Sequence, residues 1–225
     1  DMFPRVSTVT SRPLRARNAE EKKKRRSEIL RAAECLWLNT PYSELSMSQV
    51  AREAQLAKGT LYLYFDTKEE LFLALLSEHL EEWLKDLLQH LETHRYDSPD
   101  DLTDFIVSSV LPQESLRRML VLLNQVIDSS ISPEQSQNFR RLLLRYIVSI
   151  VECMPYDRNV NLRILMHVYA LALGWQMVAS GPHLDQHPAF LATSPHPHPR
   201  PSFEGEFRLG LRAAVHAIIQ EATQN

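Results

Sequence analysis

The sequence predicts an all-α fold of about nine helices. Apolar residues recur at spacings of three, four and seven along most of the chain, which is the period of amphipathic helices. Ser, Thr or Asp, in two cases followed by Pro, marks the start of successive segments, and Pro ends others. The chain has five glycines and few runs of β-branched residues, so an all-β fold is not expected.

The expected helices group into two domains behind a flexible arm. Residues 1–17 contain two prolines, Ser, Thr and scattered Arg, a composition typical of a disordered basic arm. Residues 18–66 should form a small helical domain and residues 67–225 a larger one. We expect helices at 18–38, two short ones within 46–65, one of about seven turns from Thr67, and then at 98–111, 113–128, 132–154, 158–180 and after Ser202.

Residues 46–65 are interpreted as two short helices joined by a tight turn. The second of these, over about 58–64, would pack inward through Leu61 and Phe65. Its other side then offers a cation, a small residue, a hydroxyl and phenols, which suit phosphates and base edges better than catalysis. A helix-turn-helix places such a helix in the DNA major groove. The first helix has an apolar face and two possible caps, namely Met47, Val50, Ala51 and Ala54, with Ser46 or Ser48.

This stretch resembles the DNA-binding domain of the tetracycline-repressor (TetR) family of bacterial regulators. The resemblance spans about the first third of the chain and rests on Ser46-Met47, Val50-Ala51, Lys58-Gly59-Thr60-Leu61-Tyr62, Tyr64-Phe65 and Lys68-Glu69-Glu70-Leu71. Two positions depart from the family, which usually has Gly where this chain has Gln55 and Ser or Thr where it has Ala57. Gln in a left-handed turn is strained, and Ala at a helix start forgoes about 1 kcal/mol.

Double-stranded DNA is therefore the expected partner. Residues 12–31 hold nine Lys or Arg and three Glu, a net charge of +6, in a chain whose total charge is −3. A basic end on an acidic body favours a polyanion at one end only. We expect Tyr62 to reach the DNA and Tyr64 to be partly packed, because residues two apart cannot share a helix face. The candidate DNA contacts are Ser46, Ser48, Lys58, Gly59, Thr60, Tyr62, Tyr64, Lys68, Lys24 and Arg25.

The larger domain is expected to bind a small hydrophobic or aromatic effector and to form a homodimer. In the family that the chain resembles, these helices surround a ligand cavity, and an apolar lining with few polar groups suits one. The candidate pocket residues are Trp83, Phe105, Gln125, Tyr146, His167, Trp175 and Gln176. Residues 158–180 are apolar nearly all round and need cover on two sides. The candidate dimer residues are Leu165, Tyr169, Phe207, Leu211, Val215 and Ile218.

Other chemistries find little support in the sequence. Cys35 and Cys153 lie far apart and have no metal-ligand spacing, so we interpret them as two buried thiols in a reducing compartment. The Pro-rich stretch contains His183, His187, His196 and His198, but His196-Pro197-His198 has no carboxylate or thiolate cluster beside it, and no metal or cofactor is expected. No signal peptide is visible, and no apolar run is clean enough for a membrane span. A cytoplasmic location is expected.

The sequence thus predicts a homodimeric repressor that a ligand releases from a palindromic operator. The chain contains no paired acid and base, nucleophile motif or phosphate loop, so an enzyme is not expected. Two alternatives stay open. One is a ligand-independent regulator whose larger domain only dimerises, and the other is a helical carrier or enzyme that contains a helix-turn-helix. The operator, the effector, the controlled genes and the sign of regulation do not follow from the sequence.

Overall fold

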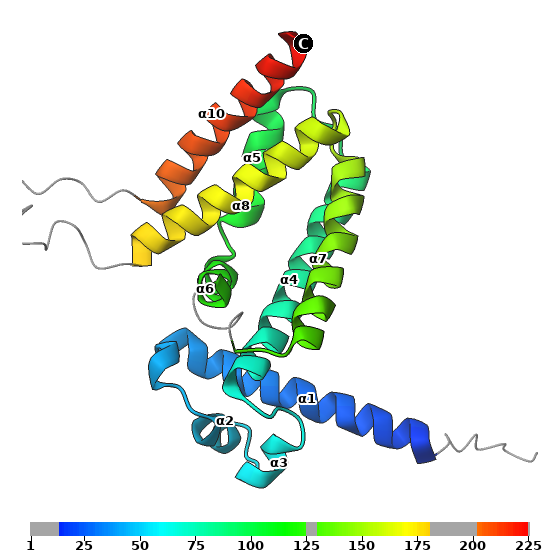
Figure 1. Cartoon of the computed structure of the whole chain (residues 1–225), viewed down its shortest axis with the longest axis vertical. Coiled ribbons are helices and arrows are strands. Elements are labelled where there is room, and N and C mark those ends of the chain that lie inside the picture. Colours follow the sequence, from blue (N-terminus) through cyan, green and yellow to red (C-terminus); the bar gives the residue numbers. More distant parts are fainter. Residues whose placement is uncertain (1–13, 125–129, 181–201, 225) are drawn as a thin grey trace, which may run out of the picture. The chain divides into compact units, whose positions relative to one another are not determined.

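The computed structural model describes residues 14–124, 130–180 and 202–224, and these form nine α-helices, one short 3-10 helix and no strand (Figure 1). This confirms the predicted all-α class. The chain divides into two compact units, Asp1–Leu71 and Phe72–Asn225. The division falls within one helix, so the two units share a continuous element.

Unit 1 is a small bundle around a helix-turn-helix. It contains α1 (Leu14–Asn39), the 3-10 helix η1 (Tyr42–Glu44), α2 (Met47–Glu53), α3 (Lys58–Tyr62) and the start of α4 (Lys68–Thr93). Helix α1 packs on α2, and α2 packs on α3. The core of the unit consists of apolar side chains that are almost fully buried, including Ile29, Leu30, Ala33, Trp37, Val50, Leu61 and Phe65.

Two helix boundaries of unit 1 differ from the predictions. Helix α1 begins at Leu14 rather than Asn18, so residues 14–17 are helical rather than part of an arm. Leu, Arg and Ala are good helix formers and extend the helix up to Pro13. Helix α3 ends at Tyr62 rather than Tyr64. The chain turns there because Phe65 must reach the core, where it is 2% exposed.

The turn between α2 and α3 carries the strain that the sequence indicates. Gln55 has φ of 56° and is the only non-glycine residue of the described chain with positive φ. The turn is closed by a hydrogen bond from the Leu56 amide to the Ala51 carbonyl oxygen, 2.8 Å long. Ala57 begins α3 without a side-chain cap. Both departures from the family pattern are therefore real features of the local backbone.

Unit 2 comprises the rest of α4 with α5 (Pro99–Val110), α6 (Glu114–Leu122), α7 (Pro133–Cys153), α8 (Arg158–Ser180) and α10 (Phe203–Gln224). Three starts follow the predicted serine caps, since the Ser98, Ser132 and Ser202 hydroxyls accept backbone N–H bonds of 3.1, 3.2 and 3.0 Å. Helix α6 is shorter than the predicted 113–128. It ends at Leu122, and residues 125–129 lie outside the described chain.

The helices of unit 2 pack around α8. Helix α10 runs along α8 and α5, and α6 and α7 also contact α8 (Figure 1). Helices α4 and α7 are joined where Glu81 accepts hydrogen bonds from Arg145 and Tyr146. Of the helices in the described residues, α8 is the one long and apolar enough to cross a membrane. Its Ile164 is fully buried, and its Gln176 is hydrogen-bonded to Arg117 within the unit.

Replacing Gln55 with Gly should stabilise the protein by about 1 kcal/mol, because Gly adopts positive φ without the steric cost of a β-carbon. Urea denaturation followed by circular dichroism measures the change. Gln113→Gly, at a non-helical position of negative φ, is the matched control and should be destabilising. Equal effects of the two substitutions would contradict the assigned left-handed turn.

Candidate nucleic-acid interface and ligand cavity

The start of α2 is fixed by a capping box. The Ser46 hydroxyl accepts a hydrogen bond from the Gln49 amide, 3.3 Å long, and the Gln49 side chain accepts one from the Ser46 amide, 2.8 Å long. Of the two candidate serines, Ser46 is therefore the cap, and its hydroxyl is engaged in this hydrogen bond. Ser48 lies exposed in the first turn and keeps its hydroxyl available at the surface.

Helix α3 presents a polar face. Leu61 is fully buried and fixes the orientation of the short helix, so Lys58, Gly59 and Tyr62 are exposed and Thr60 is half-buried. The Lys58 ammonium lies 5.9 Å from the centre of the Tyr62 ring. Tyr64 is half-buried beyond the end of the helix. One cation, a hydroxyl and one phenol thus share the outer side, which is a set of groups suited to DNA.

Lys68 occupies a different position from the one predicted. Its ammonium donates hydrogen bonds to the carbonyl oxygens of Tyr42 and Leu45, both 2.9 Å long. It also lies 4.0 Å from the centre of the Tyr42 ring. The group is therefore held by the protein, and the expected phosphate contact by Lys68 stays a prediction. The sequence indicates a charge beside α3 but not the two carbonyl groups that face it.

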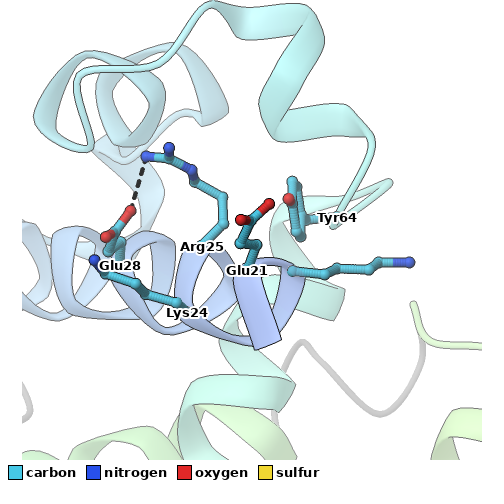
Figure 2. Close-up of a pocket in the computed structure, with 6 residues that line it drawn as sticks. Glu21, Lys24, Arg25, Glu28 and Tyr64 are labelled. Carbon is cyan, nitrogen blue, oxygen red and sulfur yellow. Dashed lines mark hydrogen bonds and ion pairs between the residues drawn. The ribbon is translucent and has the colours of Figure 1, made fainter. Parts of the chain in front are cut away.

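Basic residues of α1 border an open hollow of about 520 Å³ near Tyr64. Figure 2 shows Arg25 directed toward Glu28, and their 2.8 Å ion pair partly neutralises the guanidinium. Lys24 is exposed on the same helix. Because Glu21 and Glu28 also border the hollow, its charge is mixed, and Lys24 is better placed than Arg25 to meet an outside phosphate.

Unit 2 contains an apolar cavity of about 350 Å³ between α4, α5, α6, α7 and α8. Of the predicted pocket residues, Trp83 and Phe105 line it. The Trp83 indole N–H does not serve the cavity, because it donates to the Ser109 hydroxyl at 2.8 Å. Gln125 lies outside the described residues. The lining is otherwise almost wholly made of Leu, Ile, Val and Met side chains.

Four predicted pocket residues lie elsewhere, since none of them lines the cavity in the described structure. Tyr146 donates its hydroxyl proton to Glu81 at 3.1 Å, and Gln176 accepts from Arg117 at 3.0 Å. His167 is exposed on α8. Trp175 packs against α10, where its indole nitrogen would lie 3.9 Å from a β-carbon at Gly210. Polar groups on these helices are bound by other helices rather than directed into the cavity.

Polar residues that the sequence reasoning missed border the cavity at α6 and α8. Arg117 is 7% exposed, and burial lowers the pKa of its guanidinium. It is satisfied by the Gln176 side chain and by the Val110 and Leu111 carbonyl oxygens, with the Phe203 ring 3.8 Å away. Gln113 also lines the cavity. A Gln just after Pro112, at the start of a helix, was the available signal for it.

Four of the six predicted dimer residues are buried within their own chain, whereas Leu165 is half-buried and Tyr169 is exposed. Phe207, Leu211 and Val215 are fully buried and Ile218 is 3% exposed, because the apolar stripe of α10 packs on α8 and α5 of its own chain. Leu165 and Tyr169 line the cavity. The outward faces of α8 and α10 nevertheless carry exposed apolar or small residues, namely Met166, Ala170, Gly174, Met177, Leu209, Ala213 and Ala217.

The structure shows the positions of the two thiols and of the described groups that could bind a metal. Within the described residues no cluster of three or more His, Cys, Asp or Glu could hold a metal ion, and the four histidines between 183 and 198 lie outside those residues. Cys35 is exposed rather than buried, because the opposite face of α1 enters the core. Cys153 is half-buried, and burial raises the pKa of its thiol.

Known proteins share both the domain and the fold. Residues 29–75 match the family model of bacterial regulatory proteins, tetR family. The HTH-type transcriptional regulator YfiR of Bacillus subtilis (strain 168) is 35% identical over 68 residues, which cover 30% of this chain and 33% of that protein. The chain therefore aligns with only about a third of that relative's length.

Solved structures are similar over most of the chain. A TetR-family transcriptional regulator from Mesorhizobium loti MAFF303099 has a TM-score of 0.62 at 16% identity and covers 88% of this chain and 96% of its own. Thermus thermophilus FadR, a TetR-family repressor in complex with lauroyl-CoA, has a TM-score of 0.55 at 16% identity, with 86% and 93% covered. At these identities the similarity shows the fold.

Residues 29–75 of the amino-terminal unit are therefore similar to the bacterial regulatory proteins of the tetR family. Over most of its length the chain shares its fold with the solved structures.

Proposed function

We propose that the chain is a cytoplasmic, homodimeric repressor that binds a palindromic DNA operator and releases it when a ligand occupies the cavity of unit 2. The observation that carries the proposal is the outer face of α3, where Lys58, Thr60 and Tyr62 stand around a fully buried Leu61. In this role α3 lies in the major groove, and Ser48 and Lys24 contact phosphates.

A dimer is required because one short recognition helix buries too little surface for specific binding. Two copies related by a two-fold axis place their α3 helices about 34 Å apart, one helical turn of DNA. The exposed face of α8 and α10 supports this assembly. Ala170, Gly174, Ala213 and Ala217 are small and exposed, and a β-carbon at Gly174 would meet nothing within 4 Å, so a partner helix can approach closely.

The ligand that the cavity favours is neutral and mainly apolar. The N–H of Trp83, the guanidinium of Arg117 and the hydroxyl of Tyr169 are engaged by Ser109, by α5 carbonyls and Gln176, and by Asn124. Among the described lining residues, Gln113 is the polar group without a side-chain hydrogen bond. A buried carboxylate or phosphate would lose its hydration and would have to compete with the carbonyl oxygens and Gln176 for the Arg117 guanidinium. The acyl chain of the ligand in Thermus thermophilus FadR supports an apolar body.

Helix α4 supplies the route from ligand to DNA. It contributes Trp83, Leu84 and Leu87 to the cavity wall and begins at Lys68 in unit 1. A ligand that binds one position of α4 better than another shifts the population toward it. If that position changes the spacing of the two α3 helices, the operator is released.

Replacing Lys58 or Tyr62 with Ala should weaken operator binding about tenfold or more, because groove contacts are worth about 1–3 kcal/mol each. Lys58→Ala should also reduce the slope of log K against log salt by about 0.9 for each lost phosphate contact. Fluorescence anisotropy with an operator selected from random DNA measures both. Lys85→Ala, an exposed cation on α4, is the control. Unchanged DNA affinity in both α3 variants would contradict the proposal that α3 contacts the DNA.

Replacing Ala170 or Ala213 with Glu should convert the dimer to a monomer, because a two-fold axis brings the new charge into an apolar interface on both sides. Sedimentation velocity reports the oligomeric state. Leu144→Glu changes an exposed leucine of α7 and should leave the dimer intact. A dimer that survives both α8 and α10 substitutions would place the interface elsewhere.

Decan-1-ol should bind at least tenfold more tightly than decanoate at pH 7.5, because the ionised acid loses its hydration and has to displace the protein partners of Arg117 to reach its charge. Isothermal titration calorimetry measures both affinities, and operator release is followed in parallel. Gln113→Leu should reduce the preference for the alcohol over decane. Equal affinities for the alcohol and the acid would contradict the proposal of a neutral ligand. Tight ligand binding without operator release supports the ligand-independent regulator.

A further inference from the structure

The first turn of α4 binds the segment that precedes α2. Lys68 donates to the carbonyl oxygens of Tyr42 and Leu45 at 2.9 Å each, at the end of η1. Leu45 is 3% exposed and is followed directly by Ser46, the cap of α2. The ammonium thus holds the backbone one residue before the helix-turn-helix begins.

A second contact uses the neighbouring carboxylate. The Tyr42 hydroxyl donates to Glu69 at 2.8 Å, and its ring lies under the Lys68 ammonium at 4.0 Å. Burial and the Glu69 carboxylate raise the pKa of Tyr42, so the phenol stays protonated and remains a donor. Lys68, Tyr42 and Glu69 form one connected group, named the latch below.

The far end of the helix-turn-helix is tied to the same turn. The Glu70 carboxylate accepts a hydrogen bond from the Asp66 amide at 2.8 Å, and the Thr67 hydroxyl accepts one from the Glu70 amide at 3.1 Å. Asp66 follows Phe65, whose ring is buried in the core of unit 1. Residues 46–65 are therefore held at both ends by residues 67–70.

We infer that Lys68 is a positioning residue that sets the angle of α3 through the latch, rather than a contact to the DNA backbone. The inference rests on the proposed DNA-binding function. Two carbonyl oxygens accept two of the three N–H groups of the ammonium and the Tyr42 ring covers another side of it, so the protein itself holds this group in place. The latch instead makes α2, α3 and the first turn of α4 move as one body.

The latch and a phosphate contact differ in what their loss does to DNA binding. A phosphate contact is independent of sequence, so its loss weakens operator and scrambled DNA alike and lowers the salt slope. A misplaced α3 loses its contacts to the base edges, so the affinity for the operator falls and the affinity for scrambled DNA does not. Tyr42→Phe separates the two cases most cleanly, because it removes a hydrogen bond without changing any charge.

The experiment measures affinity for a selected operator and for scrambled DNA between 50 and 300 mM salt, in about six steps, at temperatures well below the melting midpoint of each variant. Tyr42→Phe and Lys68→Met should lower the operator-to-scrambled ratio about fivefold to tenfold. The salt slope of Tyr42→Phe should equal that of the wild type. Glu69→Ala removes an anion, so electrostatics alone would tighten both complexes, whereas loss of the latch lowers the ratio.

Each outcome decides between the two roles. A Lys68→Met variant that weakens both DNAs equally and lowers the slope as much as Lys58→Ala overturns the latch and makes Lys68 a phosphate contact. Unchanged ratios in Tyr42→Phe and Glu69→Ala also overturn it. Failure of the DNA-binding function looks different, because the wild type then shows no preference for any DNA and Lys58→Ala has no effect.

Discussion

One ammonium group organises the amino-terminal unit. The Tyr42 carbonyl oxygen accepts the Leu45 amide within the single 3-10 turn, and the Leu45 carbonyl oxygen follows directly after that turn. Lys68 donates to both oxygens, and Tyr42 contributes its ring to the same cation. Because those oxygens lie immediately before the cap of α2, the geometry of the helix-turn-helix depends on where α4 begins. The segment before α2 and the first turn of α4 are thereby tied together within unit 1.

In the larger unit, too, buried polar groups are held by hydrogen bonds to other protein groups. Arg117 is buried without a carboxylate in ion-pair distance among the described residues, and it is held by two α5 carbonyl oxygens and Gln176. Trp83 and Tyr146 likewise direct their polar atoms to neighbouring helices. Polar groups in this unit join helices to one another. The cavity between them is lined mainly by apolar side chains, and this division supports the proposal of a neutral ligand.

The sequence was a good guide to helices and a weaker guide to what they face. Ser98, Ser132 and Ser202 begin helices as predicted, because a cap is a local interaction. The stripe of Phe207, Leu211 and Val215 was correctly read as buried, but an amphipathic pattern does not say whether the cover comes from the same chain or another. Tyr146 and Gln176 are buried too, yet their partners, Glu81 and Arg117, lie 65 and 59 residues away.

Some residues of the candidate site could likewise be placed from the sequence, and others could not. The exposed face of α3 follows from the spacing of Leu61 and Phe65, so Lys58 and Tyr62 could be placed from the sequence. Lys68 could not, because its role depends on carbonyl oxygens that only the folded chain brings to it. The strained Gln55 was visible as a departure from the family pattern.

The anchoring of Trp83 has an optical consequence. The chain has three tryptophans; Trp37 is buried in unit 1 and Trp175 packs on α10. Trp83 alone of these lines the cavity, and its indole is pinned by Ser109. Because this hydrogen bond holds the indole ring, the ring keeps its orientation when a ligand fills the cavity beside it. The tryptophan fluorescence of this protein therefore reports, through its emission wavelength and intensity, whether water or hydrocarbon occupies the cavity.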